Sequence, residues 1–166
     1  MAVIFGTEIG IGEAHLIGAI LMVQFAGTPF TVLFGRLPKK SGTKNSIILT
    51  LAVYTIISVL GYFTQKAFHF WLLAILVATV QGGAQTLSRS MFASMIPKSR
   101  SAEFFGFYSV SRKFSGIIGP MIFGLVGQLT GSSRLSILSI IIFFVSGTLV
   151  LTTVNHKKGI EAANEQ

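Results

Sequence analysis

The sequence predicts an all-α protein that crosses a membrane several times, and three observations lead to this fold class. Of its 166 residues, 51% are hydrophobic and only 11% are charged, whereas a soluble domain has about 25% charged residues. The mean hydropathy is +0.74. Five runs of 20 to 22 residues contain no Asp, Glu, Lys or Arg, namely 14–35, 45–65, 67–88, 114–133 and 135–156. About 20 helical residues cross the ~30 Å hydrocarbon core, and a helix pairs its own backbone groups there. A water-soluble domain is therefore excluded, and a polytopic bundle with five complete transmembrane helices is predicted.

The first 13 residues are apolar but too short to cross a membrane. They lack the basic start and the small-residue cleavage site of a signal peptide. We expect them to be the outer end of a truncated first helix, whose beginning precedes Met1. A short interfacial segment would have the same composition.

The helical part of the chain is expected over 1–154. Its complete spans are predicted at 14–36, 45–64, 68–92, 103–129 and 134–154. Residues 155–166 form a short polar tail, which we expect to fray.

The first complete span carries a polar stripe at mid-membrane depth. Gln24, Thr28 and Thr31 are spaced i, i+4 and i+7, beside Pro29, so their side chains share one helix face. Gln24 and Thr28 are therefore candidates for a substrate pathway. By contrast, the spans 45–64 and 134–154 hold few polar residues beyond hydroxyl side chains, and we expect them to be a lipid-facing scaffold.

The loop GRLPKKSGTK at 35–44 joins the first two complete spans. Pro38 cannot continue the preceding helix, and Gly42 is suited to a turn. The charges alone fit an ordinary basic loop. Five residues of the loop follow a more particular order: Gly35, Leu37, Lys40, Gly42 and Lys44.

The third span places Gln81, Gln85, Ser88 and Phe92 on one helix face. Buried amides at membrane depth need partners from other helices or a wet cavity. Two interpretations remain open: contacts between helices, with Gly82 and Gly83 permitting close packing, or contacts with a substrate. Gln81, Gln85 and Ser88 are therefore pathway candidates. Arg89 is expected to extend to the membrane surface.

The fourth span contains a lysine and a stripe of small residues. Lys113 lies ten residues after Glu103, so it either reaches the interface or is a buried cation that faces a carboxylate or an acidic substrate. The second interpretation makes Lys113 a further pathway candidate. The stripe permits close helix packing or a bend, because Pro120 frees a backbone carbonyl. Its members are Gly116, Gly119, Pro120 and Gly124.

The basic residues are distributed unevenly between the two sides of the predicted bundle. Alternate connections assign eleven of them to one side and two, Lys66 and Arg134, to the other. The positive-inside rule then places the carboxyl terminus in the cytoplasm. The net charge of +8 is thus a topology signal, and no nucleic-acid partner is expected.

Two motifs resemble the major facilitator superfamily. The loop 35–44 is similar to its Gly-x-Leu-x-Asp-Arg-x-Gly-Arg-Arg motif at Gly35, Leu37, Lys40, Gly42 and Lys44, and Lys39 stands where the family has Asp. The resemblance implies that these five residues are candidates for a gating motif. Gly116-x-x-Gly119-Pro120 resembles the antiporter motif in the fifth helix of a half. The block 82–120 resembles most closely the vacuole-effluxer-like (autophagy-related amino-acid exporter) family. The resemblance covers nearly the whole chain and implies the carboxyl-terminal half of a major facilitator fold.

The resemblance implies transport of a small solute, and in yeast vacuoles export of amino acids, by alternating access. It also implies a partner, the missing amino-terminal six-helix half, within a lipid bilayer that we expect to be a bacterial inner membrane. The alternative is a small five-span scaffold or accessory subunit. With no Asp and no Cys, a membrane-embedded enzyme, a metal site and a bound cofactor are not expected.

Overall fold

The computed structural model describes residues 2–8 and 10–165, apart from the side chains of Ala2 and Lys40. The elements are α1 (Ala2–Glu8), α2 (Glu13–Phe34), α3 (Pro38–Ser41), α4 (Thr43–Tyr62), α5 (Ala67–Ser94), a 3-10 turn (Lys98–Arg100), α6 (Ser101–Thr130), α7 (Ser133–Thr153) and α8 (His156–Asn164). No strand occurs in these described ranges, so the predicted all-α class is confirmed.

The complete spans expected from the charge-free runs correspond to α2, α4, α5, α6 and α7, and every boundary agrees within two residues. Among the described helices, α2, α4, α5 and α7 are long and apolar enough to cross a membrane. Helix α6 has 30 residues but includes Arg112 and Lys113 and several small side chains. The protein is an integral multi-pass membrane protein, and the predicted fifth span depends on the length of α6 rather than on its apolar character.

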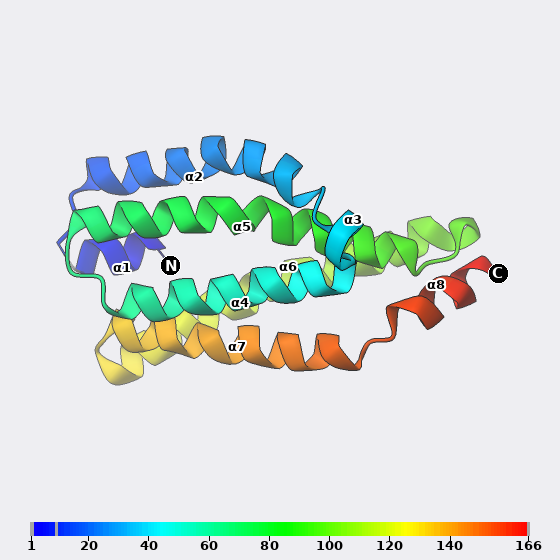
Figure 1. Cartoon of the computed structure of the whole chain (residues 1–166). Coiled ribbons are helices and arrows are strands. Elements are labelled where there is room, and N and C mark those ends of the chain that lie inside the picture. The colour runs from blue at the N-terminus through cyan, green and yellow to red at the C-terminus, as the bar shows by residue number, and fades with distance from the viewer. Residues whose placement is uncertain (1, 9, 166) are drawn as a thin grey trace.

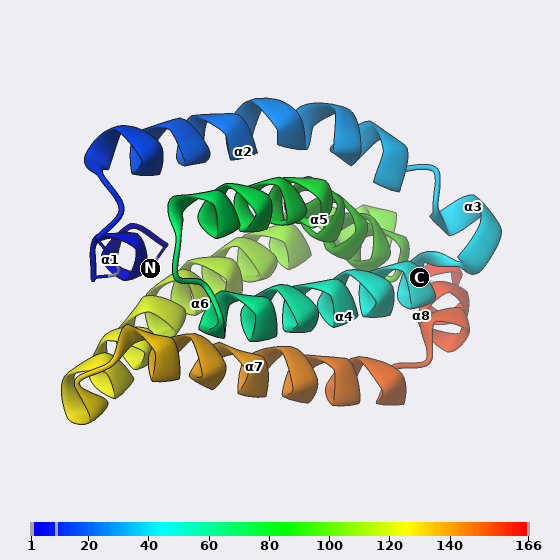
Figure 2. The ribbon, with the colours of Figure 1, turned by 60° about the vertical axis from the view of Figure 1, so that its left-hand side comes forward.

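The five long helices lie roughly side by side (Figure 1). Helix α5 packs against α2 and α4, and α7 packs against α4 and α6. Figure 2 shows α1 at one end of the bundle, below the beginning of α2. The spatial order α2, α5, α4, α7 and α6 therefore differs from the order along the chain.

Helices α2 and α5 approach closely at two adjacent glycines. A Cβ atom added to Gly82 would overlap the hydroxyl of Thr31, and one added to Gly83 would lie 2.5 Å from Cγ of Phe34. The Thr31 hydroxyl donates a hydrogen bond to the Gly27 carbonyl of its own helix, at 2.9 Å. The predicted role of these glycines in close helix packing is confirmed.

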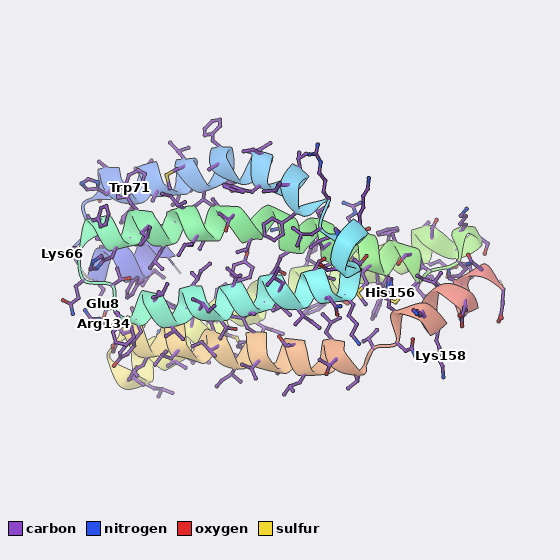
Figure 3. The ribbon with its side chains drawn as sticks, viewed as in Figure 1. Glu8, Lys66, Trp71, Arg134, His156 and Lys158 are labelled. Atoms are coloured by element: carbon purple, nitrogen blue, oxygen red, sulfur yellow. The ribbon has the colours of Figure 1, made fainter. Side chains whose placement is uncertain are left out.

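The carboxylate of Glu8 caps the first turn of α7. Both of its oxygens accept a hydrogen bond from the backbone N–H of Ser133, at 3.2 Å, and this N–H has no partner within its own helix. The hydrogen bonds from Ser133 lower the pKa of Glu8 below its usual value, and the nearby Arg134 lowers it further. Figure 3 shows Glu8 and Arg134 at the same end of the bundle.

This cap predicts that the attachment of α1 to α7 depends on pH. Because the pKa of Glu8 is lowered, the stabilisation is complete above the usual value of 4.5 and is lost as the pH falls through the lower pKa of the docked state. Hydrogen exchange of the α1 amides, after correction for intrinsic rates, should therefore stay constant above the usual value of 4.5 and accelerate as the pH falls below it. In Glu8→Gln the corrected rates should not change with pH. A wild type with equally constant rates would contradict the prediction.

Two expectations about polar segments are wrong. The tail does not fray over 156–164, because Gly159 of α8 packs against Met95 after α5, and His156 shares a 2.9 Å hydrogen bond with Ser94. Two of the eleven basic residues that the sequence assigns to one side, Arg112 and Lys113, are expected at the connection before α6. They lie within that helix, about 17 Å beyond its start, so these two charges do not belong to a connection.

Candidate functional site

A cavity of about 600 Å³ lies between the long helices. Most of its lining is apolar and comes from α2, α4, α5 and α7, and Phe5 of α1 and Phe123 of α6 also line it. The lining contains no charged side chain among the described residues. Three polar side chains reach it, those of Gln24, Ser58 and Gln81. The structure therefore brings together two predicted site residues that lie 57 positions apart in the chain.

The two amides lie near the middle of their helices. Gln24 is about 17 Å beyond the start of α2, and Gln81 is about 21 Å beyond the start of α5. Neither amide side chain has a hydrogen-bond partner in the part of the chain that the structure describes. The third polar group differs, because the hydroxyl of Ser58 donates to the Tyr54 carbonyl at 3.0 Å. The amides thus retain donors and acceptors for a bound molecule.

The remaining polar stripe residues lie outside this cavity. The lining residues belong to the half of α2 and α5 that is nearer to α1, between Ala19 and Gln24 and between Phe70 and Gln81. Thr28, Gln85 and Ser88 follow them towards the basic end of the bundle. Thr28 and Gln85 are exposed and Ser88 is half-buried. Their part in a substrate pathway stays a prediction.

The basic loop has a definite structure around its glycine and its last lysine. Pro38 begins the short helix α3, and Gly42 has a φ of +77°, which favours glycine. The ammonium group of Lys44 donates to the carbonyls of Thr152 and Val154, each at 2.8 Å. A lysine is well placed at a helix end where carbonyls lack partners, so the loop is fastened to the end of α7.

The other members of the loop motif are less closely engaged. Gly35 ends α2, and a Cβ there would lie 3.3 Å from the Val32 carbonyl. Leu37 is half-buried before α3. The side chain of Lys40 lies outside the described residues. A gating role for the loop stays a prediction.

Comparison with known proteins identifies the family. The model of the family described as "Vacuole effluxer Atg22 like" matches residues 1–164. The chain belongs to this family. An uncharacterized MFS-type transporter of Bacillus subtilis, YxiO, is 37% identical over 166 residues, which are 100% of this chain and 39% of the relative. Autophagy-related protein 22 of Saccharomyces cerevisiae is 28% identical over 155 residues, 90% of this chain and 28% of the relative.

The matched region is only part of these relatives. The chain spans about two fifths of the Bacillus transporter and less than a third of the yeast protein. No solved structure matches this chain. The predicted family resemblance is confirmed. The Bacillus relative is a transporter by name, and the family is described as vacuole effluxers. Both findings support the prediction of a membrane transporter.

In this Atg22-like chain, much of α6 is open. A Cβ added to Gly116 or Gly124 would meet no atom within 4 Å in the described structure, whereas one added to Gly127 would lie 3.0 Å from the Ser136 hydroxyl. Pro120 and Lys113 are exposed, and Gly119 is half-buried. The packing or hinge role of this stripe, and the choice between the two interpretations of Lys113, therefore stay predictions.

Sequence reasoning missed an aromatic cluster where α5 and α6 meet. Phe92 stacks on Tyr108 with ring centroids 4.8 Å apart, and the guanidinium of Arg89 lies 5.5 Å from the centroid of Phe105. Arg89 is exposed and contacts an aromatic face, and its extension to the membrane surface stays a prediction. The i, i+3 spacing of Phe105 and Tyr108 places them on one helix face and was the signal available in the sequence. It does not show that Phe92 of another helix is their partner.

Proposed function

We propose that this chain is the carboxyl-terminal half of a transporter and that its cavity holds a small solute during alternating access. The observation that carries the proposal is the pair of amides, Gln24 and Gln81, in a mostly apolar cavity at mid-helix depth, where the third polar group, Ser58, is already hydrogen-bonded to its own helix. A few placed polar groups in an apolar pocket are typical of small-molecule sites. Transporters of this architecture bind substrate near the bilayer midplane and rock their halves around it.

The chemistry of the lining favours a solute with a polar head and an apolar body. Two amides can donate to a carboxylate or carbonyl and accept from an amino group. Leu73, Val77 and Ile140 offer an apolar surface to the rest of the molecule. An amino acid with an apolar side chain meets this description. The absence of a charged group from the described lining disfavours solutes with a large net charge.

The exposed surface of α6 is evidence for a second half of the transporter that covers it. Between Glu103 and Pro120, the side chains of Ser109, Arg112 and Lys113 on α6 are exposed in the described structure. Polar and charged groups at membrane depth face protein or a wet cavity rather than lipid. We therefore propose that the amino-terminal six helices cover this face, and that Lys113 turns towards them or towards the solute.

The orientation proposed from the charges places the basic end in the cytoplasm of a bacterial cell. Arg36, Lys98 and Lys157 lie at that end, opposite Lys66 and Arg134. This arrangement agrees with the positive-inside rule and would leave the carboxyl-terminal α8 cytoplasmic.

Transport by the complete protein tests the proposal. In vesicles, Gln81→Ala is expected to raise the KM for a transported neutral amino acid about three- to tenfold, because one hydrogen bond to the solute is lost. Gln128→Ala is the matched control, since Gln128 is exposed on α6 and does not line the cavity. Equal KM values for both variants would remove the cavity as the solute site. An absence of transport by a folded wild type, for any amino acid, would favour the scaffold alternative.

A further inference from the structure

We propose that a second cleft, at the basic end of the bundle, binds the phosphate of an anionic phospholipid. This cleft has a volume of about 470 Å³. It lies between the turn that precedes α4 and the turn that joins α7 to α8, and residues 41–45 and 152–157 line it. It shares no residue with the cavity that holds Gln24 and Gln81, so this proposal does not depend on the transport proposal.

The charge of the cleft suits an anion. Lys44 and Lys157 contribute two ammonium groups, His156 adds a ring, and no carboxylate lines the cleft among the described residues. The carbonyls of Thr152 and Val154 would repel a phosphate, but Lys44 already binds both. Its ammonium retains a third N–H. Phosphate binding by lysine needs only a well-placed point charge.

The surroundings of the cleft favour a lipid over a free anion. The last turns of α7 expose Leu149 and Val150, with 63% and 65% of their surfaces accessible, and α7 is apolar enough to span the membrane. A phospholipid could place its acyl chains along this face and its phosphate in the cleft where α7 ends. A free phosphate would use only the polar part of this surface.

The far wall of the cleft is held in place by contacts of α8. His156 is hydrogen-bonded to Ser94, and Gly159 packs on Met95. Figure 3 shows His156 on the side of α8 that faces α5, and Lys158 on the opposite side. The neighbouring lysines therefore differ: Lys157 lines the cleft and Lys158 does not.

This difference provides a matched pair of variants. The purified full chain in neutral detergent is titrated with dioleoylphosphatidylglycerol, and native mass spectrometry gives the dissociation constant of the first bound lipid. Lys157→Gln is expected to weaken binding about fivefold, whereas Lys158→Gln should leave it within about twofold of the wild type. Dioleoylphosphatidylcholine should bind more weakly than phosphatidylglycerol to the wild type and equally to both variants.

Three outcomes would overturn the proposal. Equal losses in Lys157→Gln and Lys158→Gln would indicate diffuse surface charge, and no loss in either would exclude the cleft. Full displacement of the lipid by inorganic phosphate at the same concentration as the lipid would show that the cleft binds a free anion. Retention of the lipid against inorganic phosphate, together with a loss confined to Lys157→Gln, supports the lipid site.

Discussion

Replacing Gly83 with leucine is expected to prevent α2 from docking on α5. Even a single Cβ at this position would lie 2.5 Å from Cγ and 2.7 Å from Cβ of Phe34, so the helices must separate or Phe34 must leave its site. Inserting extra methylenes into a well-packed contact costs about 1–3 kcal/mol, and leucine adds several at the most extensive helix pair of the bundle. We expect a sharp fall in the monodisperse fraction on size-exclusion chromatography and in the melting temperature in detergent.

Gly147→Leu is the control for this substitution. Gly147 lies within α7, and a Cβ there would meet nothing within 4 Å in the described structure. The same change of residue, in another long apolar helix, should therefore leave the elution profile and the melting temperature close to those of the wild type. A Gly83→Leu protein as monodisperse and as stable as Gly147→Leu would show that the close approach of α2 and α5 does not exist.

The second large effect is expected for Lys44→Met, which keeps the length of the side chain and removes both hydrogen bonds to α7. Hydrogen bonds from a charged donor contribute about 1.5–3 kcal/mol, and the ammonium of the half-buried residue Lys44 makes two of them at 2.8 Å. The loss also leaves the carbonyls of Thr152 and Val154 without this partner. We expect the melting temperature to fall by about 4–8 °C and hydrogen exchange to accelerate at the end of α7 and in α8.

Lys39→Met separates this effect from a general loss of positive charge. Lys39 lies in α3, in the same basic segment, and its side chain is exposed. Because both variants remove one charge from the same connection, they alter the positive-inside balance equally. Equal thermal shifts for the two would indicate that charge alone matters and that the contact of Lys44 with α7 does not stabilise the fold.

The local part of the site could be predicted from the sequence, whereas its assembly could not. The loop glycine was predicted at a turn, and Gly42 has the positive φ that explains its presence. Gln81 continues an i, i+3/i+4 series of cavity-lining positions from Phe70 through Leu73 and Val77. Such spacing identifies the face of a helix that packs against a neighbour or lines a cavity. It does not reveal which other helix that face meets. Gln85 and Ser88 belong to the same predicted face and lie outside the cavity.

The sequence by itself determined that this protein lies in a membrane. It also determined the number of long helices, the residues where they begin and end, and the end of the bundle where most cations gather. These properties depend on residues within one helix or one connection, because hydrophobic length and chain breaks are local. Only the tertiary structure decided that Gln24 faces the same cavity as Gln81, that Lys44 binds carbonyls 108 and 110 residues further on, and that Glu8 caps α7. Lipid provides little hydrophobic preference between helices. Which helices become neighbours is therefore settled by small residues such as Gly82 and Gly83 and by a few polar contacts, whose partners are distant in the chain.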